Sequence, residues 1–287
     1  MCRNSDHLLS STDTFTAYIK MKGKPWRKIT CANVNGRAIY QGCIILGQTE
    51  AIKTAAAAFE KQLKEHPELL TKANMELQGV AVAGQQFRWA QGIIPYYLPA
   101  DFPAPERIHK AFDHWHERTR IRFVKQSTEA DYIVFSVSDE GCASAIGRRG
   151  DAQDVLLGAD CGVGNIIHEL GHSVGLWHEQ AREDRDKYVE VLWDNIDQDA
   201  WFNYEQNTGD FDDVGPGYDY ASIMHYTLTS FQAGDQPTMR VRAPLPAGTP
   251  SPDPAIIGQR NGLSDGDVKA VAALYPNLPE RPWQRLA

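Results

Sequence analysis

Residues 163–186 read VGNIIHELGHSVGLWHEQAREDRD, and this stretch decides the fold that we expect. His168 and His172 are four residues apart, so on a helix their imidazoles lie on one face, one turn apart, and can share one metal ion. Gly175 is a helix stop that permits positive φ and a sharp turn, which lets His178 return to the same ion. The spacing therefore predicts a helix that ends near Gly175, with a three-histidine metal site on one of its faces.

The donor set of this site favours zinc in a catalytic role. Three imidazole nitrogens and one water form the open arrangement of catalytic zinc sites, whereas structural sites are closed by four protein ligands. Zinc lowers the pKa of its bound water to about 7, and Glu169 lies next to the first ligand, where it can take the water's proton as a general base. We expect one Zn²⁺ and hydrolysis of a peptide bond. Histidines without a metal are the alternative, but their convergence around a helix stop has no packing rationale.

The extended motif resembles that of the metzincin endopeptidases, and specifically the astacin family. Five further segments carry the resemblance, which covers about residues 80–277. They are RxDRD at 182–186, the Met-turn SIMHY at 222–226, RWAQGIIPYYL at 88–98, RIRFV at 120–124 and GQRNGLSDGDVKAVAALY at 258–275.

The resemblance implies an α+β, zincin-like fold. A twisted mixed β-sheet with an active-site helix and a backing helix would be followed by an irregular C-terminal subdomain, with a deep cleft between the two. Residues 1–79 would form an inhibitory pro-segment and residues 80–287 the catalytic domain, divided into subdomains of about 80–175 and 176–287. The strand near residues 142–148 would bind extended protein or peptide substrates by edge pairing.

The resemblance also implies roles for residues around the metal. Tyr226 corresponds to a tyrosine that is an extra zinc ligand without substrate and stabilises the oxyanion during the reaction; a packed aromatic is the alternative. Met224 would lie beneath the zinc ligands, and we interpret His225 as a structural residue. Glu179 would bind the new amino terminus, formed by a cut near Gly79–Val80, or would be a surface carboxylate.

The cysteines match the family in part. The chain has five of them, so at least one thiol lacks an intramolecular disulfide partner. Cys142 and Cys161 match one family disulfide. The other has no counterpart near Thr119 or after Tyr275, so we expect the terminal helix to be held by packing alone. Whether Cys2 and Cys31 are free stays open.

Tyr40, Gln41, Gly42 and Cys43 stand where astacin precursors carry an aromatic-x-Gly-Asp motif whose aspartate caps the zinc. A thiolate is a good zinc ligand. We therefore expect Cys43 to coordinate the zinc of a latent zymogen and to hold the pro-segment, an intramolecular inhibitor, over the site. A buried strand cysteine and a Cys31–Cys43 disulfide are the alternatives.

Hydrophobic periodicity predicts the remaining elements. The amino-terminal region shows too little apolar surface for an independent domain and is expected to pack on something else. His109, His114 and His116 lie on one predicted helix, where solvated side chains are favoured over a second metal site. The predicted strands are residues 37–46, 121–124, 131–137 and 155–157, and the helices are 50–65, 106–118, 163–175 and 264–275.

Composition excludes other classes of function. The formal net charge is −8, so nucleic acid is not expected as a partner. No apolar run reaches the length of a membrane span. The first residues lack the apolar region of a signal peptide, so we expect export without a cleaved leader, or a leader trimmed from this chain. The rival functions are a catalytically silent zinc-binding or interaction protein of the same fold, which the intact Glu169 disfavours, and a metal-dependent hydrolase of non-peptide bonds.

Overall fold

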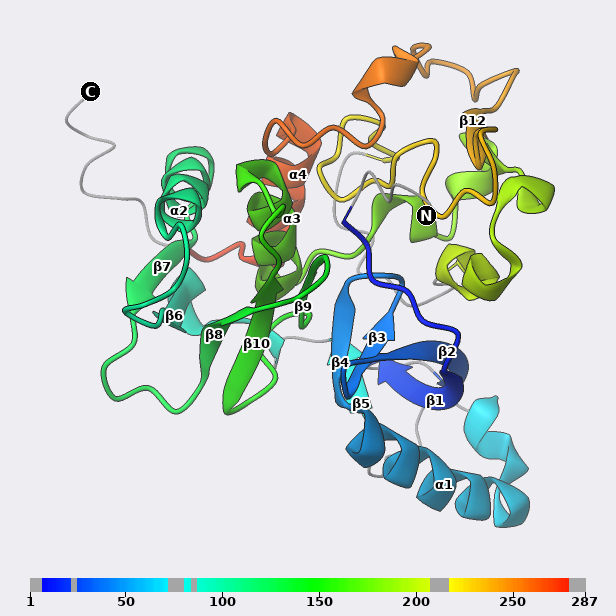
Figure 1. Cartoon of the computed structure of the whole chain (residues 1–287). Helices are drawn as coiled ribbons and strands as arrows, with labels where there is room; N and C mark the ends of the chain where they lie inside the picture. Colours follow the sequence, from blue (N-terminus) through cyan, green and yellow to red (C-terminus); the bar gives the residue numbers. More distant parts are fainter. Residues whose placement is uncertain (1–6, 22–24, 72–79, 84–86, 207–216, 279–287) are drawn as a thin grey trace.

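The computed structural model describes residues 7–21, 25–71, 80–83, 87–206 and 217–278 (Figure 1). Within these residues the strands are β1 (Thr14–Met21), β2 (Trp26–Val34), β3 (Arg37–Tyr40), β4 (Ile44–Gln48), β5 (Val80–Ala83), β6 (Ile93–Tyr97), β7 (Arg122–Lys125), β8 (Tyr132–Val137), β9 (Cys142–Ser144), β10 (Ala152–Leu157), β11 (Val189–Val191) and β12 (Met239–Val241). The α-helices are α1 (Thr49–Glu65), α2 (Glu106–Arg118), α3 (Val163–Val174) and α4 (Asp265–Leu274). Short 3₁₀ helices occur in the described residues between α3 and β12.

The described strands form a ten-stranded mixed sheet and a separate pair, β11 with β12. The order in the large sheet is β5-β1-β2-β3-β4-β9-β10-β8-β6-β7. Strands β9, β10, β8, β6 and β7 form its carboxyl-terminal half, with α2 and α3 beside them in Figure 1. Strands β5, β1, β2, β3 and β4 form the amino-terminal half, with α1 along its outer side (Figure 1). The predicted α+β fold with a mixed sheet is confirmed.

Helix α2 follows the prediction from its apolar spacing. Ile108, Ala111, Phe112 and Trp115 are all buried, as their i, i+3, i+4, i+7 spacing predicts. The indole of Trp115 donates to the main-chain oxygen of Ile167 at 3.2 Å, which joins α2 to α3. The helix therefore backs the helix that carries the histidine motif.

Helix α3 ends where the sequence predicts. Its last helical residue is Val174, and Gly175 has φ 119°, a left-handed conformation that favours glycine. At the other end the Asn165 side chain accepts from the main-chain nitrogen of Gly162 at 3.2 Å. The sharp stop turns the chain back toward the helix and brings His178 to the motif.

The amino-terminal region differs from the prediction of one strand over residues 37–46. The chain reverses at Gln41 and Gly42, which have φ 46° and 72°, so β3 and β4 form a hairpin. Two consecutive residues with positive φ match the right-handed twist of flanking strands. The prediction was wrong because the apolar residues on either side of this turn read as one continuous strand. The turn places Cys43 at the end of the hairpin.

This region also has more of a core than its sequence suggests. The Phe59 ring of α1 lies 4.4 Å from the ring of Trp26 and 4.9 Å from that of Tyr18, measured between centroids. Leu69 is fully buried against the same cluster. Since all these residues belong to the amino-terminal region, it forms a small hydrophobic core of its own.

The amino-terminal region continues the sheet of the rest of the chain. Strand β4 pairs in parallel with β9 through Ile44 and Ser144, and the Ser144 nitrogen donates to the Cys43 oxygen at 2.9 Å. The expected boundary at residues 79–80 falls partly outside the described residues, because 72–79 are not described. Strand β5 begins at Val80 and pairs with β1.

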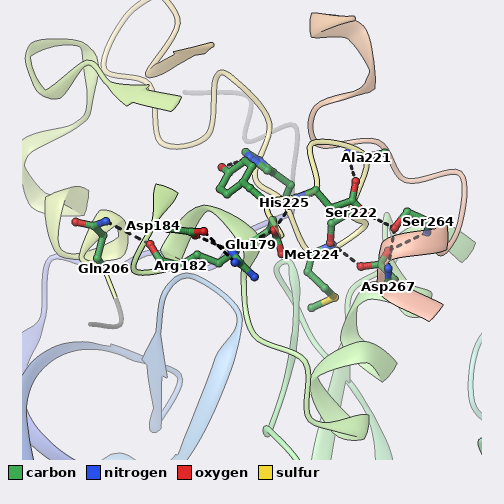
Figure 2. A network of polar contacts seen from close by, with 12 residues as sticks. Glu179, Arg182, Asp184, Gln206, Ala221, Ser222, Met224, His225, Ser264 and Asp267 are labelled. Carbon is green, nitrogen blue, oxygen red and sulfur yellow. Dashed lines mark hydrogen bonds and ion pairs between the residues drawn. The ribbon is translucent and has the colours of Figure 1, made fainter. Parts of the chain in front are cut away.

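Helix α4 is held by hydrogen bonds as well as by packing, which corrects the expectation of packing alone. Its capping box pairs Ser264 with Asp267, each side chain accepting from the other residue's main-chain nitrogen at 2.9 Å. Asp267 also accepts from the Ser222 hydroxyl at 2.6 Å (Figure 2). At the other end the Tyr275 hydroxyl donates to the Val174 oxygen at 2.8 Å. These contacts tie the terminal helix to the Met-turn and to α3.

None of the helices in the described part of the chain is long and apolar enough to cross a membrane.

Candidate metal centre

Four buried side chains from three parts of the chain converge on one point. The Sγ atom of Cys43 lies 3.5 Å from Nε2 of His168, 3.3 Å from Nε2 of His172 and 3.2 Å from Nε2 of His178. The four donor atoms all lie within 4.8 Å of one another. Two histidines come from α3, the third follows its glycine stop, and the cysteine comes from the β3–β4 turn. The structure thus brings together the three predicted histidines and Cys43.

The other ring nitrogens show which way the histidines face. Nδ1 of His168 lies 2.8 Å from the Ile223 oxygen, and Nδ1 of His172 lies 2.8 Å from the Leu176 oxygen. A carbonyl oxygen only accepts, so each Nδ1 carries the hydrogen and each Nε2 turns a lone pair toward the centre. Burial lowers the pKa of His172 to about 4 and keeps its ring neutral, the form that binds metals.

This donor set fits a zinc ion. Three neutral imidazole nitrogens and one sulfur are ligands that Zn²⁺ prefers, and four ligands complete its tetrahedral coordination. Polar atoms are otherwise costly to bury, and these four lie within 4.8 Å of one another. With Cys43 in place the set is closed by protein atoms, whereas the three histidines alone leave a position for another ligand.

Glu169 lies beside the first histidine on α3 and is 3% exposed. Burial raises the pKa of its carboxyl group well above the ordinary value, and the positive charge of Arg260 opposes this effect. Its Oε2 atom is buried and has no hydrogen-bond partner among the described residues. A buried carboxyl oxygen that makes no hydrogen bond to the described residues and lies one residue from His168 is suited to bind and transfer a proton.

Met224 is buried against helix α3. It is 1% exposed, and a Cβ atom added at Gly171 would lie 2.7 Å from its sulfur. Gly171 stands between the helical histidines, so the methionine packs directly against the turn of α3 that carries them. The predicted position beneath the ligands is consistent with this contact.

Arg260 and Asp267 hold the Met-turn through its main chain. The Arg260 guanidinium donates to the oxygens of Ile223 and His225, at 3.1 Å each. Asp267 accepts from the Ile223 nitrogen at 2.9 Å. The Ile223 oxygen is also the partner of His168, so this fixed turn orients a candidate ligand. Sequence reasoning singled out neither role, because both depend on contacts between distant segments.

His225 has the structural role that was expected. Its Nδ1 lies 2.7 Å from the Tyr226 oxygen, and its Nε2 lies 2.6 Å from the Tyr218 hydroxyl. Within the described residues it is not part of the group of convergent metal donors.

Tyr226 is fully buried beside the centre, with its ring 4.9 Å from that of His178. Its hydroxyl donates to the main-chain oxygen of Gln41 at 2.6 Å. Within the described part of the chain it is therefore engaged by the amino-terminal region, and it is not one of the four convergent donors.

Glu179 lies in a cluster of charges rather than at the surface. Its side chain is 15% exposed, so the alternative of a surface carboxylate is wrong. It accepts from the Asp219 nitrogen at 2.8 Å. Its Oε1 lies 3.5 Å from Nε of Arg182 (Figure 2). Burial raises the pKa of this carboxyl to about 8, while Arg182 opposes the rise. A contact with a new amino terminus stays a prediction.

The cysteine alternatives are resolved for the described residues. Cys142 and Cys161 form a disulfide, as the resemblance implied. Cys31 and Cys43 are both buried and are not joined in a disulfide, so the alternative of a Cys31–Cys43 disulfide is wrong. Cys2 lies outside the described residues.

The histidines of α2 serve the fold. Nε2 of His114 accepts from the Leu263 nitrogen at 2.9 Å, and Nε2 of His116 accepts from the Phe123 nitrogen at 3.0 Å. The favoured interpretation as solvated side chains was therefore wrong for these two, while His109 is exposed as expected. Among the described residues they do not form a second group of metal donors.

Comparisons with known proteins agree on one family. The sequence model of the Astacin peptidase family matches residues 81–276. Tolloid-like protein 1 of Homo sapiens is 36% identical over 192 residues, which are 65% of this chain and 19% of that protein. The chain thus spans about a fifth of that relative's length.

Two similar proteins are closer to this chain in length. Nematocyst expressed protein 6 of Nematostella vectensis is 37% identical over 202 residues, which are 68% of this chain and 67% of that protein. High choriolytic enzyme 1, a hatching enzyme zinc-protease from Oryzias latipes, has a solved structure that is 32% identical with a TM-score of 0.59. That match covers 70% of this chain and 98% of the solved chain.

Proposed function

Since the chain belongs to the astacin family of peptidases, we propose that it is a zinc-dependent endopeptidase kept latent by its own amino-terminal segment. The observation that carries the proposal is the convergence of His168, His172 and His178 with Cys43, whose donor atoms lie within 4.8 Å of one another. We further propose that residues 1–79 are the inhibitory segment and residues 80–287 the catalytic domain.

The three histidines hold the metal in both the latent and the active form. When bound, zinc supplies Lewis acidity that polarises a substrate carbonyl and lowers the pKa of a neighbouring water. Glu169 takes a proton from the attacking water and passes it to the leaving amine. Its position beside His168 on α3 and its buried, unpartnered oxygen support this role.

Tyr226 acts on the carbonyl oxygen of the substrate. As the carbon becomes tetrahedral, its hydroxyl donates to the oxygen on which negative charge develops. The contact with the Gln41 oxygen at 2.6 Å supports this role, because here too the hydroxyl binds a main-chain carbonyl. Without substrate or pro-segment, Tyr226 is proposed to turn toward the metal.

Latency has two parts in this proposal. Cys43 would be the fourth residue to hold the zinc, and its thiolate would keep water and a substrate carbonyl away from the ion. Strand β4 also pairs with β9 through Ile44 and Ser144. The proposed substrate-binding edge is therefore already covered while the segment is attached.

Activation removes both obstacles by a cut near Gly79–Val80. The new amino terminus then moves to Glu179, whose carboxyl group lies in a mostly buried, charged cluster with Arg182 and Asp219. The similar protein named as a hatching enzyme zinc-protease favours protein or peptide substrates over esters. The Cys142–Cys161 disulfide supports action in an oxidising compartment, and so export from the cell.

A casein assay tests this function on three proteins, each with its zinc counted. They are the full chain, a form beginning at Val80 that is released from it at an engineered protease site, and the same released form with Glu169→Gln. We expect about one zinc per chain in all three and cleavage only by the released wild-type form. Zinc without cleavage in the released form would leave a catalytically silent zinc protein, and cleavage of esters alone would favour a different hydrolase.

A further inference from the structure

Gln41 contacts the candidate metal centre without being one of its ligands. It is fully buried at the β3–β4 turn and occupies the variable position of the motif that ends in Cys43. Its Oε1 lies 3.2 Å from Nδ1 of His178, 137 residues away. Its Nε2 donates to the Glu205 oxygen at 3.2 Å and to the Tyr40 hydroxyl at 3.3 Å.

These contacts fix the orientation of the Gln41 amide. The Glu205 oxygen is a main-chain carbonyl and can only accept, so the amide nitrogen must face it. The amide oxygen then faces His178, and Nδ1 of His178 must carry the hydrogen and donate. The lone pair of its Nε2 is thereby directed to the point where the three rings meet.

His178 differs from the other two candidate ligands in the origin of this partner. His168 is oriented by the Ile223 oxygen and His172 by the Leu176 oxygen, both in the proposed catalytic domain. The partner of His178 comes from the segment that activation would remove.

The main chain of the same residue holds a second group of the site. The Gln41 oxygen accepts from the Tyr226 hydroxyl at 2.6 Å. The next residue, Gly42, has φ 72°, and a Cβ atom there would lie 2.8 Å from Cζ of Phe231. The turn therefore packs tightly against Phe231, and this packing fixes the position of the Gln41 carbonyl.

We propose that Gln41 is a positioning residue that orients His178 and restrains Tyr226. The amino-terminal segment then contacts the site through two residues: Cys43, which binds the metal, and Gln41, which binds His178 and Tyr226. This inference rests on the proposed function, because it concerns how a latent zinc site is held. Its consequence is that the full chain retains zinc more firmly than Cys43 alone would achieve. Removal of outer hydrogen-bond partners of metal ligands typically costs 10–100-fold in metal affinity.

The test measures the release of zinc from the full chain to an excess of a coloured chelator. Gln41→Met keeps the length of the side chain but has no acceptor for His178, and we expect release about 10–100-fold faster than in wild type. Gln41→Glu keeps an oxygen that accepts from His178, so its release should be clearly slower than that of Gln41→Met. Gln48→Met is the control, since Gln48 is exposed at the end of β4.

Two further measurements separate positioning from a loss of fold. Thermal unfolding of the zinc-free variants reports their stability. The zinc-release rates of Gln41→Met and Gln41→Glu are compared under conditions in which the two zinc-free variants are equally stable. In chains loaded with Co²⁺, the thiolate-to-metal absorption band shows whether Cys43 is still bound.

Equal release from Gln41→Met and wild type, or from Gln41→Met and Gln41→Glu, overturns the role of Gln41. If wild type has the thiolate band, this result leaves the proposed function intact. A wild-type chain that binds neither zinc nor Co²⁺ overturns the proposed function and this inference together.

Discussion

Two regions of opposite character meet at the candidate metal centre: helix α3 and the turn at residues 41–43. Helix α3 is packed in the main core, and its histidines are oriented by carbonyl oxygens of the same domain. The turn depends on two residues with positive φ, and the buried side chains of its hairpin pack in clusters that also contain residues from the rest of the chain. Under the proposed function, the half of the site on α3 is permanent, and the half at residues 41–43 is removable with the amino-terminal segment.

The largest effect should come from the permanent half. A structural zinc site binds with about 10–16 kcal/mol, so one of four ligands accounts for roughly 3 kcal/mol, or about 100-fold in affinity. His172→Ala should therefore weaken zinc binding by about 100-fold or more in the full chain and in the released form alike. Competition with a chelator measures both affinities. A loss confined to one form would contradict the division into two halves.

The next effect concerns the removable half. Cys43→Ala should leave the released form unchanged, because that form lacks the residue. In the full chain it should raise basal casein cleavage by about 10–100-fold, since the fourth ligand is lost while other contacts remain. Cys31→Ala is the control, because Cys31 is a free, buried cysteine of the same region. Latency that persists unchanged in Cys43→Ala would refute the thiolate cap.

A smaller effect should follow from the backbone of the turn. Gly42→Ala requires a left-handed alanine, which costs about 1–2 kcal/mol, and adds a close contact with Phe231. We expect a lower melting temperature and raised basal cleavage in the full chain. Gly36→Ala is the matched control, because Gly36 has φ 80° and nothing within 4 Å of an added Cβ. Gly36→Ala should lower the melting temperature without raising basal cleavage. An equal rise in basal cleavage in both variants would show that latency does not depend on the turn at Gly42 in particular.

The smallest effect should be shared by both forms. Ser264→Ala removes the N-cap of α4 and should cost about 1 kcal/mol, which lowers the melting temperature by about 2–4 °C in a domain of this size. Thermal unfolding of the full chain and of the released form should show similar shifts. A shift in the full chain alone would indicate that α4 supports the amino-terminal region instead of the Met-turn.

The sequence predicted the permanent half well, because its signals are local. The four-residue spacing of His168 and His172 and the glycine stop describe a single helix, and the apolar spacing of α2 describes another. Cys43 came instead from a family resemblance, since no spacing relates it to a helix 125 residues away.

The remaining features depend on contacts that leave no pattern in the chain. Gln41 reads as an ordinary strand residue, because neither its positive φ nor its contact with His178 is visible in the sequence. His114 and His116 looked solvated, since helical periodicity does not show that distant main-chain nitrogens approach their rings. Such tertiary hydrogen bonds appear only once the packing of the elements is known.

The pairing of β4 with β9 has a consequence for the aggregation of the protein. While it lasts, the Ser144 nitrogen donates to the Cys43 oxygen at 2.9 Å and the sheet continues across the joint. An uncovered strand edge is a template for pairing with other chains, including further copies of the same chain. Under the proposed function, the precursor is therefore protected from edge-to-edge aggregation at β9, and the released domain exposes this edge when it becomes able to bind an extended peptide.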